Sequence, residues 1–272
     1  MPLWIAILLG VVQGFTEFLP VSSSGHLALL QNVLDFSKYG VDHITFDILL
    51  HLGTLVAVFA AFWKDIVELV RGALGLVFDR FQCKGKPERR LVVLLLIATV
   101  PLVVGALLEN LVESMFQSTL FIGCALLVTA AMLWLSCRFA GGGKTAATAK
   151  NSDAVRVGLM QLLALFPGIS SSGSTICGGL LSGFGRDFAV SSAFLMSIPA
   201  VLGAVVLKLP KMFAAGIAAE NVLPYAAGFI VSAVSGYAAI RLVRLLMKKN
   251  SFRYFAVYCA VLGAAVIILT IL

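Results

Sequence analysis

One pattern occurs twice in this chain, first as Gly10-Val-Val-Gln-Gly-Phe-Thr-Glu-Phe-Leu-Pro-Val-Ser-Ser-Ser-Gly25 and again, 148 residues later, as Gly158-Leu-Met-Gln-Leu-Leu-Ala-Leu-Phe-Pro-Gly-Ile-Ser-Ser-Ser-Gly173. The first glycine, the glutamine, the serine triplet and its closing glycine keep the same spacing in both copies. A proline, Pro20 or Pro167, precedes each triplet. Because proline interrupts helices and Ser/Gly clusters form turns, each copy predicts an apolar helix that breaks and restarts at the triplet.

The composition is that of an integral membrane protein. Hydrophobic residues make up 60% of the chain, charged residues only 12%, and the mean hydropathy is +1.03. A soluble domain of this length does not show such a balance. The first residues lack the basic start of a secretory signal, so we expect the N-terminus to be retained. Neither a zinc site nor disulfides are expected from the scattered cysteines, which are Cys83, Cys124, Cys137, Cys177 and Cys259.

Six apolar runs are long enough to cross about 30 Å of hydrocarbon. Of the 20 lysines and arginines, 17 fall in the connections that follow the first, third and fifth runs, Arg186 included. This placement argues against nucleic acid as the partner of the net charge of +7. If these connections are cytoplasmic, both termini lie on the outer side. The runs are Thr45–Trp63, Leu91–Leu108, Thr119–Cys137, Ser191–Leu209, Val222–Leu242 and Phe255–Leu272.

The two broken helices, about Leu3–Asn32 and Val155–Phe184, are interpreted as re-entrant hairpins that enter and leave on one side. Each half then has one hairpin and three spans, and because three is odd the second half is inserted upside down. We therefore expect an all-α polytopic membrane protein with six transmembrane helices and two re-entrant helical hairpins in an inverted-topology repeat. It forms a single membrane domain over 1–272, with repeat 1 at about 1–140, repeat 2 at about 153–272, and a flexible polar linker over 141–152.

The first copy carries the groups that chemistry needs. Gln13 and Glu17 are four residues apart and share one face of a helix. A carboxylate within an apolar helix is costly and usually functional, although a solvated glutamate near the helix end is the simpler alternative. Ser22, Ser23, Ser24, Gly25 and His26 add hydroxyls, helix-start N–H groups and an imidazole. These are the ingredients of a phosphate or oxyanion site with a nucleophile and a base beside it.

The second copy offers Ser170, Ser171, Ser172, Gly173 and Thr175 but no acid or base. It is typical of a binding element, because two helix N-termini that converge on one point favour an anion. For a single triplet, a serine-rich helix cap would be the better interpretation.

A further pair, Asp47 and His51, lies four residues apart in the first span. It could orient His26 or hold a cation, and a structural hydrogen-bonded pair is an equally good interpretation.

At these residues the chain closely resembles the undecaprenyl-diphosphate phosphatase family, the bacitracin-resistance type of integral membrane enzymes. Gln13 and Glu17 match its first motif, and the segment from Pro20 to His26 matches its Pro-Val-Ser-Ser-Thr/Ser-Gly-His element. The second motif, Pro-Gly-x-Ser-Arg-Ser-Gly-x-Thr, is matched by Pro167, Gly168, Ser170, Ser172, Gly173 and Thr175.

The resemblance implies hydrolysis of undecaprenyl diphosphate to undecaprenyl phosphate and phosphate, which recycles the lipid carrier for cell-wall synthesis and confers bacitracin resistance. It also implies the bacterial cytoplasmic (inner) membrane and a divalent cation, Mg²⁺ or Ca²⁺. Ser23 would be the nucleophile, His26 its acid/base partner, and Gln13 with Glu17 the metal- or water-orienting pair. A water nucleophile activated by His26 or Glu17 is the alternative. The diphosphate would be held by Ser22, Ser24, Gly25, Ser170, Ser171, Ser172, Gly173 and Thr175.

Ser171 departs from the family pattern, which has arginine at this position. A serine cannot supply the charge that an arginine gives to phosphoryl transfer. Either a divalent ion and the helix N-termini supply it, or the chain is a catalytically impaired variant, or it is a polyprenyl-phosphate transporter or flippase. The expected partners are the lipid diphosphate and membrane lipids, with no nucleic acid, and a homodimer is left as an alternative to a monomer.

Overall fold

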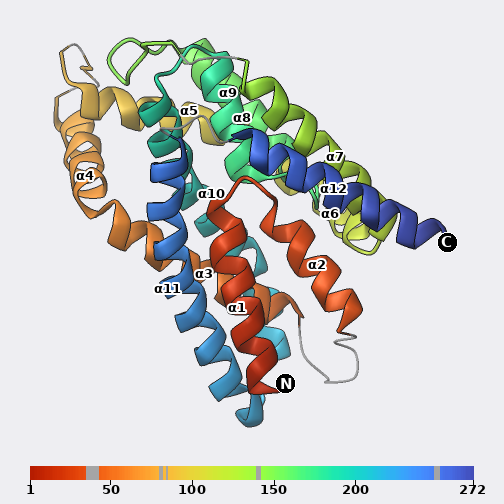
Figure 1. The fold of residues 1–272 in the computed structure, drawn as a ribbon. Helices are drawn as coiled ribbons and strands as arrows, with labels where there is room; N and C mark the ends of the chain where they lie inside the picture. Colours follow the sequence, from red (N-terminus) through yellow and green to blue (C-terminus); the bar gives the residue numbers. More distant parts are fainter. Residues whose placement is uncertain (35–42, 80–81, 84, 139–141, 248–251) are drawn as a thin grey trace.

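The computed structural model describes all residues except 35–42, 80–81, 84, 139–141 and 248–251. The described residues fold into α-helices joined by turns, and they contain no strand beyond one isolated bridge between Lys144 and Phe184. The predicted all-α class is confirmed. Figure 1 shows the order of the helices, which are α1 Leu3–Phe18, α2 Ser23–Val33, α3 His43–Ala61, α4 Trp63–Phe78, α5 Pro87–Leu107, α6 Glu109–Phe116, α7 Thr119–Ser136, α8 Asn151–Leu163, α9 Ser171–Leu181, α10 Arg186–Ala215, α11 Val222–Met247 and α12 Phe252–Ile271.

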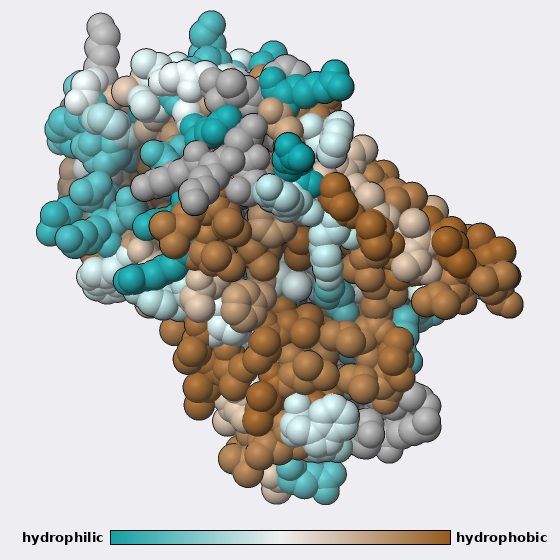
Figure 2. Space-filling model, viewed as in Figure 1, coloured by the Kyte–Doolittle hydropathy of each residue, from teal (hydrophilic) through white to brown (hydrophobic). Residues whose placement is uncertain are grey.

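Five of the described helices, α3, α7, α10, α11 and α12, are long and apolar enough to cross a membrane. A sixth span exists only if α5 and α6 count as one bent element. The protein is therefore a polytopic membrane protein with five to six candidate spans. Figure 2 agrees, because hydrophobic residues cover the lower and right-hand parts of this face and hydrophilic residues gather at the upper left.

One helix was not expected. The first span was predicted to run to Trp63, but α3 ends at Ala61 and the chain turns at Phe62 into α4. The charged residues of α4, which are Lys64, Asp65, Glu68 and Arg71, were expected in a connection. They lie on one face of an amphipathic helix whose other residues include the exposed Trp63 and Phe78.

The two repeated segments do break where the prolines predict. The first break lies between Phe18 and Ser23, and the second between Leu163 and Ser171. In both, the first serine of the triplet caps the new helix. The Ser22 Oγ accepts the Gly25 N–H at 3.2 Å, and the Ser170 Oγ accepts the Gly173 N–H at 3.1 Å.

The repeated glycines at the start of each pattern are sites of close helix packing. Helix α1 lies along α11, and α8 lies along α5 (Figure 1). A Cβ added at Gly10 would lie 2.7 Å from the Gly228 carbonyl oxygen, and one at Gly158 would lie 2.3 Å from that of Ala98. Both helices need glycine here because backbone meets backbone.

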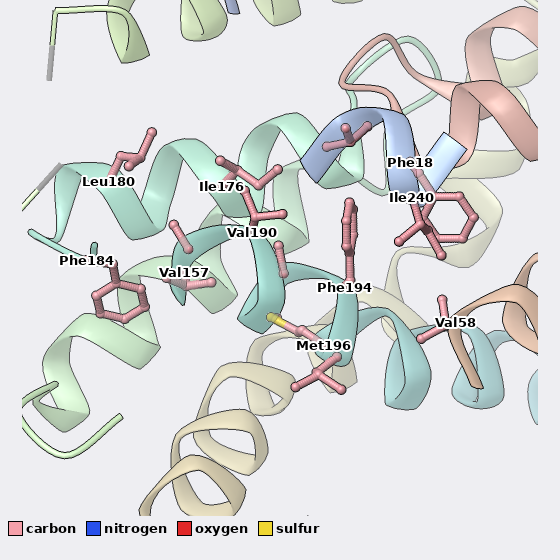
Figure 3. Close-up of a cluster of buried hydrophobic side chains, with 14 of the residues drawn as sticks. Phe18, Val58, Val157, Ile176, Leu180, Phe184, Val190, Phe194, Met196 and Ile240 are labelled. Carbon is pink, nitrogen blue, oxygen red and sulfur yellow. The ribbon is translucent and has the colours of Figure 1, made fainter. Parts of the chain in front are cut away.

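A hydrophobic cluster joins elements from both halves of the chain (Figure 3). Phe194 of α10 stacks edge-on against Phe18 of α1, with the ring centroids 5.5 Å apart. Val58, Ile176 and Ile240 are buried in the same cluster. This packing holds the end of α1, and with it the first break, against α9, α10 and α11.

The described part of the linker, from residue 142 onward, makes specific hydrogen bonds, contrary to the expectation of flexibility. The Lys144 Nζ donates to the Asp153 carboxylate at 2.8 Å and to the Ser182 carbonyl at 2.7 Å. Arg90 donates to the Ala149 carbonyl at 2.7 Å. Composition predicted a loose segment because polar and glycine-rich stretches usually lack partners, whereas these polar groups find theirs on α5, α8 and α9.

Replacing Asp153 with asparagine should destabilise this linker. Asp153 is buried, and the change leaves the Lys144 ammonium without its charged acceptor. We expect a loss of about 2 kcal/mol in the free energy of unfolding. Thermal unfolding in detergent measures it, with the exposed Glu68→Gln change on α4 as the control. Equal melting temperatures for the two variants would contradict a stabilising role of the linker.

Candidate active site

Glu17 is the centre of the polar site at the first break. Its Oε2 accepts a hydrogen bond from the Gln13 Nε2 at 3.0 Å and one from the Ser23 Oγ at 2.6 Å. Gln13 lies one helical turn earlier on α1, and Ser23 is the first residue of α2. The break folds α2 back so that its first hydroxyl reaches the last turn of α1. The structure thus brings together three of the predicted residues, with the carboxylate placed to take the proton of Ser23.

The residue before Ser23 holds an unusual backbone conformation. Ser22 has a φ of 71°, in a region that residues other than glycine rarely adopt. Such strain often occurs at functional sites. Here it turns the chain sharply between Pro20 and α2.

His51 joins the site from α3. Its Nε2 lies 3.7 Å from the Glu17 Oε2, and its Nδ1 donates to the Asp47 carbonyl oxygen at 2.8 Å. Asp47 accepts a hydrogen bond from Gln31 of α2 at 2.7 Å. Of the predicted roles for Asp47 and His51, orienting His26 is not observed, because His51 faces Glu17.

His26 is not hydrogen-bonded to Ser23, contrary to the expected acid/base pairing. Its Nδ1 donates to the Ser22 carbonyl oxygen at 2.7 Å, and its Nε2 lies 2.7 Å from the Tyr258 hydroxyl. The two rings are nearly parallel, with an angle of 7° between their planes. Nothing in the sequence indicated Tyr258, because it lies on α12, 232 residues from His26. The hydrogen-bond acceptor of Ser23 is Glu17 instead.

An apolar groove of about 360 Å³ begins at this pair. His26 and Tyr258 supply two of its few polar groups. Helices α1, α2 and α12 form its walls, and the remaining lining residues are Val11, Val12, Phe15, Thr16, Leu29, Leu30 and Leu262.

Each broken helix turns at a short segment that we call its tip, residues 19–25 in the first and 166–173 in the second. The second tip is more deeply buried than the first. Ser170, Ser172, Gly173 and Thr175 are all buried, whereas Ser171 is partly exposed. The Ser171 Oγ donates to the Gln161 Oε1 at 3.1 Å. The Thr175 hydroxyl donates back to the Ser171 carbonyl at 2.8 Å and stabilises the first turn of α9.

The two tips touch each other directly. A Cβ on Gly25 would lie 3.0 Å from the Gly168 Cα, and a Cβ on Gly173 would lie 3.3 Å from the Pro20 Cβ. The Ser172 hydroxyl also donates to the Leu19 carbonyl at 3.2 Å. In the numbering of the repeat, Gly25 corresponds to Gly173 and Pro20 to Gly168. The same two positions of the repeat are therefore in contact twice, once as Gly25 with Gly168 and once as Gly173 with Pro20. We call this meeting point of the two tips the junction.

The two tips are chemically unequal. Glu17 corresponds to Leu165, and His26 corresponds to Ser174, whose hydroxyl is buried without a hydrogen-bond partner among the described residues. The acid, the imidazole and the paired serine thus belong to the first tip alone. The second tip contributes hydroxyls, helix-start N–H groups and packing.

The donor set suits a hard divalent cation. The Gln13 Oε1 is fully buried and has no hydrogen-bond partner in the described part of the chain. Carboxylate and amide oxygens are the ligands that Mg²⁺ and Ca²⁺ prefer. No group of three or more His, Cys, Asp or Glu side chains that could hold a metal occurs among the described residues. Any cation here would therefore take few protein ligands and have positions left for phosphate oxygens and water.

Fold and site together define a helical membrane protein with a polar centre where two broken helices meet. The family model described as bacitracin resistance protein BacA matches residues 6–265, and the chain belongs to this family. It is 42% identical to the undecaprenyl-diphosphatase of Methanosphaera stadtmanae, over 98% of this chain and 97% of that protein. It is 41% identical to the undecaprenyl-diphosphatase of Alkaliphilus metalliredigens, over 98% of each chain. The enzyme of the same name from Rubrobacter xylanophilus is 42% identical, again over 98% of each.

Proposed function

We propose that this protein hydrolyses undecaprenyl diphosphate to undecaprenyl phosphate and inorganic phosphate. This reaction recycles the lipid carrier for cell-wall synthesis and gives resistance to bacitracin. The observation that carries the proposal is the 2.6 Å hydrogen bond from the Ser23 hydroxyl to Glu17 at the point where two helix N-termini meet. A transporter needs binding groups but has no use for a paired nucleophile and base.

The proposed reaction begins with Ser23. Glu17 takes the hydroxyl proton while the Ser23 oxygen attacks the terminal phosphorus. The bond to the bridging oxygen then breaks, and undecaprenyl phosphate leaves. Water cleaves the phosphoserine in the second step, releasing phosphate, and Ser23 regains a proton. Glu17 serves both steps. It passes the proton taken from Ser23 to the departing undecaprenyl phosphate and is again a carboxylate, which takes a proton from the attacking water and returns it to the Ser23 oxygen as phosphate leaves.

The diphosphate is held between the two tips. The first turns of α2 and α9 present backbone N–H groups and positive dipole ends toward the junction. Hydroxyls of Ser22, Ser24, Ser170, Ser171 and Ser172 surround it, with Gly25 and Gly173 allowing the close approach. Thr175 acts indirectly in this proposal, since its hydroxyl is bonded to the backbone of α9.

Glu17 and Gln13 would hold Mg²⁺ or Ca²⁺. Such an ion, when bound, neutralises charge on the diphosphate as the terminal phosphoryl group is transferred. The fit rests on the Gln13 Oε1, which has no partner in the described part of the chain, and on the Glu17 carboxylate, which the same amide contacts through Nε2.

The apolar groove would hold the first isoprenyl units of the lipid. His26 and Tyr258 stand at its head. When both ring nitrogens of His26 carry a proton, Nδ1–H donates to the Ser22 carbonyl and Nε2–H to the Tyr258 oxygen, so the Tyr258 hydroxyl would donate to the oxygen that leaves with the lipid. Tyr258 orients the imidazole through the hydrogen bond to Nε2.

Replacing Tyr258 with phenylalanine should lower kcat about 10-fold and leave KM within about 3-fold, because it removes the hydroxyl but keeps the ring in the groove. Steady-state kinetics on purified protein measure the effect. The matched control is Tyr254→Phe, one turn earlier on α12 and largely exposed. An unchanged kcat in the Tyr258 variant would exclude this orienting role.

We also propose that the two broken helices are re-entrant hairpins of an inverted repeat. The reciprocal contact of the tips supports this arrangement. So does the placement of the hairpin ends. The Met1 amino group donates to Asn221 beside the start of α11, whereas α8 and α9 are both tied to the linker. In this proposal the protein lies in the bacterial inner membrane with both termini outside.

The experiment uses vesicles that contain purified protein and undecaprenyl diphosphate. We expect inorganic phosphate to be released together with an equal amount of undecaprenyl phosphate. Movement of the intact diphosphate between leaflets, with no phosphate released, would instead support the transporter alternative.

A further inference from the structure

The orientation of His51 is the feature that the proposed reaction does not use. One ring nitrogen, Nδ1, donates to the Asp47 carbonyl oxygen at 2.8 Å, one helical turn earlier on α3. In the neutral imidazole this fixes the hydrogen on Nδ1 and leaves the lone pair on Nε2. The Nε2 lies 3.7 Å from the Glu17 Oε2.

This arrangement is typical of a metal-ligating histidine. Such residues almost always donate the second ring N–H to a backbone carbonyl or a carboxylate, which fixes the tautomer and the ring plane. A contact between two acceptors at 3.7 Å is too long for a direct hydrogen bond. Two atoms that each lie about 2.1 Å from one ion stand roughly 3 to 3.5 Å apart, so a small shift would let both share a cation.

A second, independent observation points to a ligand at the same place. The Gln13 amide donates to Glu17 through Nε2 and leaves Oε1 fully buried, without a partner among the residues that the structure describes. Buried amide oxygens are normally hydrogen-bonded. Rotation of the amide by half a turn would exchange the two atoms and place this oxygen where Nε2 now lies, 3.0 Å from the Glu17 Oε2.

We propose that the His51 Nε2 is a third protein ligand, with Glu17 and Gln13, of the divalent cation. The inference rests on the proposed function, which places a cation at Glu17. Imidazole nitrogen binds Mn²⁺ and later transition metals well and suits Ca²⁺ poorly, since Ca²⁺ selects oxygen ligands. The site therefore prefers Mn²⁺ to Ca²⁺, and His51 sets this preference.

The test is metal binding by the full-length protein in detergent, without lipid substrate, with Mn²⁺ as the probe. Pulsed electron paramagnetic resonance of bound Mn²⁺ detects coupling to a directly ligated nitrogen. Competition with Ca²⁺ gives the ratio of the two affinities. The variants are His51→Gln, which removes the ring nitrogen, and Glu17→Gln, which removes the carboxylate. Val56→Ala, at an exposed position of the same helix, is the matched control.

We expect nitrogen coupling in the unaltered protein and in the control, and none in His51→Gln. The Mn²⁺ affinity of His51→Gln should fall about 10-fold or more while its Ca²⁺ affinity changes less than about 3-fold. Bound Mn²⁺ without nitrogen coupling, lost in Glu17→Gln but not in His51→Gln, would overturn the role of His51 and leave the proposed function intact. Absence of Mn²⁺ and Ca²⁺ binding in the unaltered protein would overturn both this inference and the metal part of the proposed function. Bound Mn²⁺ without nitrogen coupling in the unaltered protein overturns the role of His51 even if a variant fails to fold.

Discussion

Changing Ser23 to alanine is expected to lower the turnover of undecaprenyl diphosphate by at least about 10³-fold. The Ser23 hydroxyl is the nucleophile of the proposed reaction, and its 2.6 Å hydrogen bond to Glu17 provides the route for its proton. Alanine removes the attacking atom but leaves the helix start in place, because the cap of α2 comes from Ser22. Substrate affinity should therefore change little. Phosphate release under substrate saturation measures the loss.

The control is Ser191→Ala on α10, whose hydroxyl donates to the Asp187 and Phe188 carbonyls within its own helix. It should turn over at the rate of the unaltered protein. Retention of more than about a tenth of the activity in Ser23→Ala would show that water, activated by Glu17, attacks the phosphorus directly.

Changing Ser171 to arginine is expected to raise turnover about 10²-fold or more. In phosphoryl transfer the protein mainly positions groups and stabilises charge, and a well-placed arginine is worth about 10³-fold to 10⁵-fold. Ser171 is the first residue of α9 and is partly exposed, next to Ser172, which contacts the first tip. A guanidinium at this position can reach the junction where the diphosphate would lie. Its cost is the lost hydrogen bond to Gln161.

The matched control for this change is Ser171→Gln, which adds a long polar side chain without a charge. If the glutamine variant gains as much activity as the arginine variant, side-chain length rather than charge explains the effect. If neither variant gains activity, the backbone N–H groups and the cation already supply the positive charge that the reaction needs. Ser171 would then fully replace the arginine of the family pattern.

The length of the apolar runs and the positions of the prolines predicted the architecture, because both signals depend only on residues that are close in the sequence. Long apolar runs indicated the spans, and the proline before each serine triplet marked both breaks within a few residues. Helix α4 was missed because its charged residues resemble those of a connection. The spacing of Lys64, Glu68 and Arg71 is that of one helix face, and this signal was overlooked because the apolar run before them ends at Trp63.

The site was predictable only where its residues lie close in sequence. Gln13, Glu17 and Ser23 fall within one helix and the start of the next, and the structure joins them. His51 and Tyr258 come from helices that only tertiary packing brings near, so their contacts with Glu17 and His26 had no local signal. The expected pairing of His26 with Ser23 is not observed in the structure, because proximity in sequence does not show where the imidazole ring lies.

The most direct test of the proposed active site compares two purified proteins, Ser171→Arg and the double variant Ser171→Arg with Ser23→Ala, on undecaprenyl diphosphate. We predict that the first releases inorganic phosphate and an equal amount of undecaprenyl phosphate, and that the second releases neither above background. Release of phosphate at the same rate by both proteins, or by neither, would contradict the assignment of hydrolysis to Ser23 and Glu17 at the junction of the two tips.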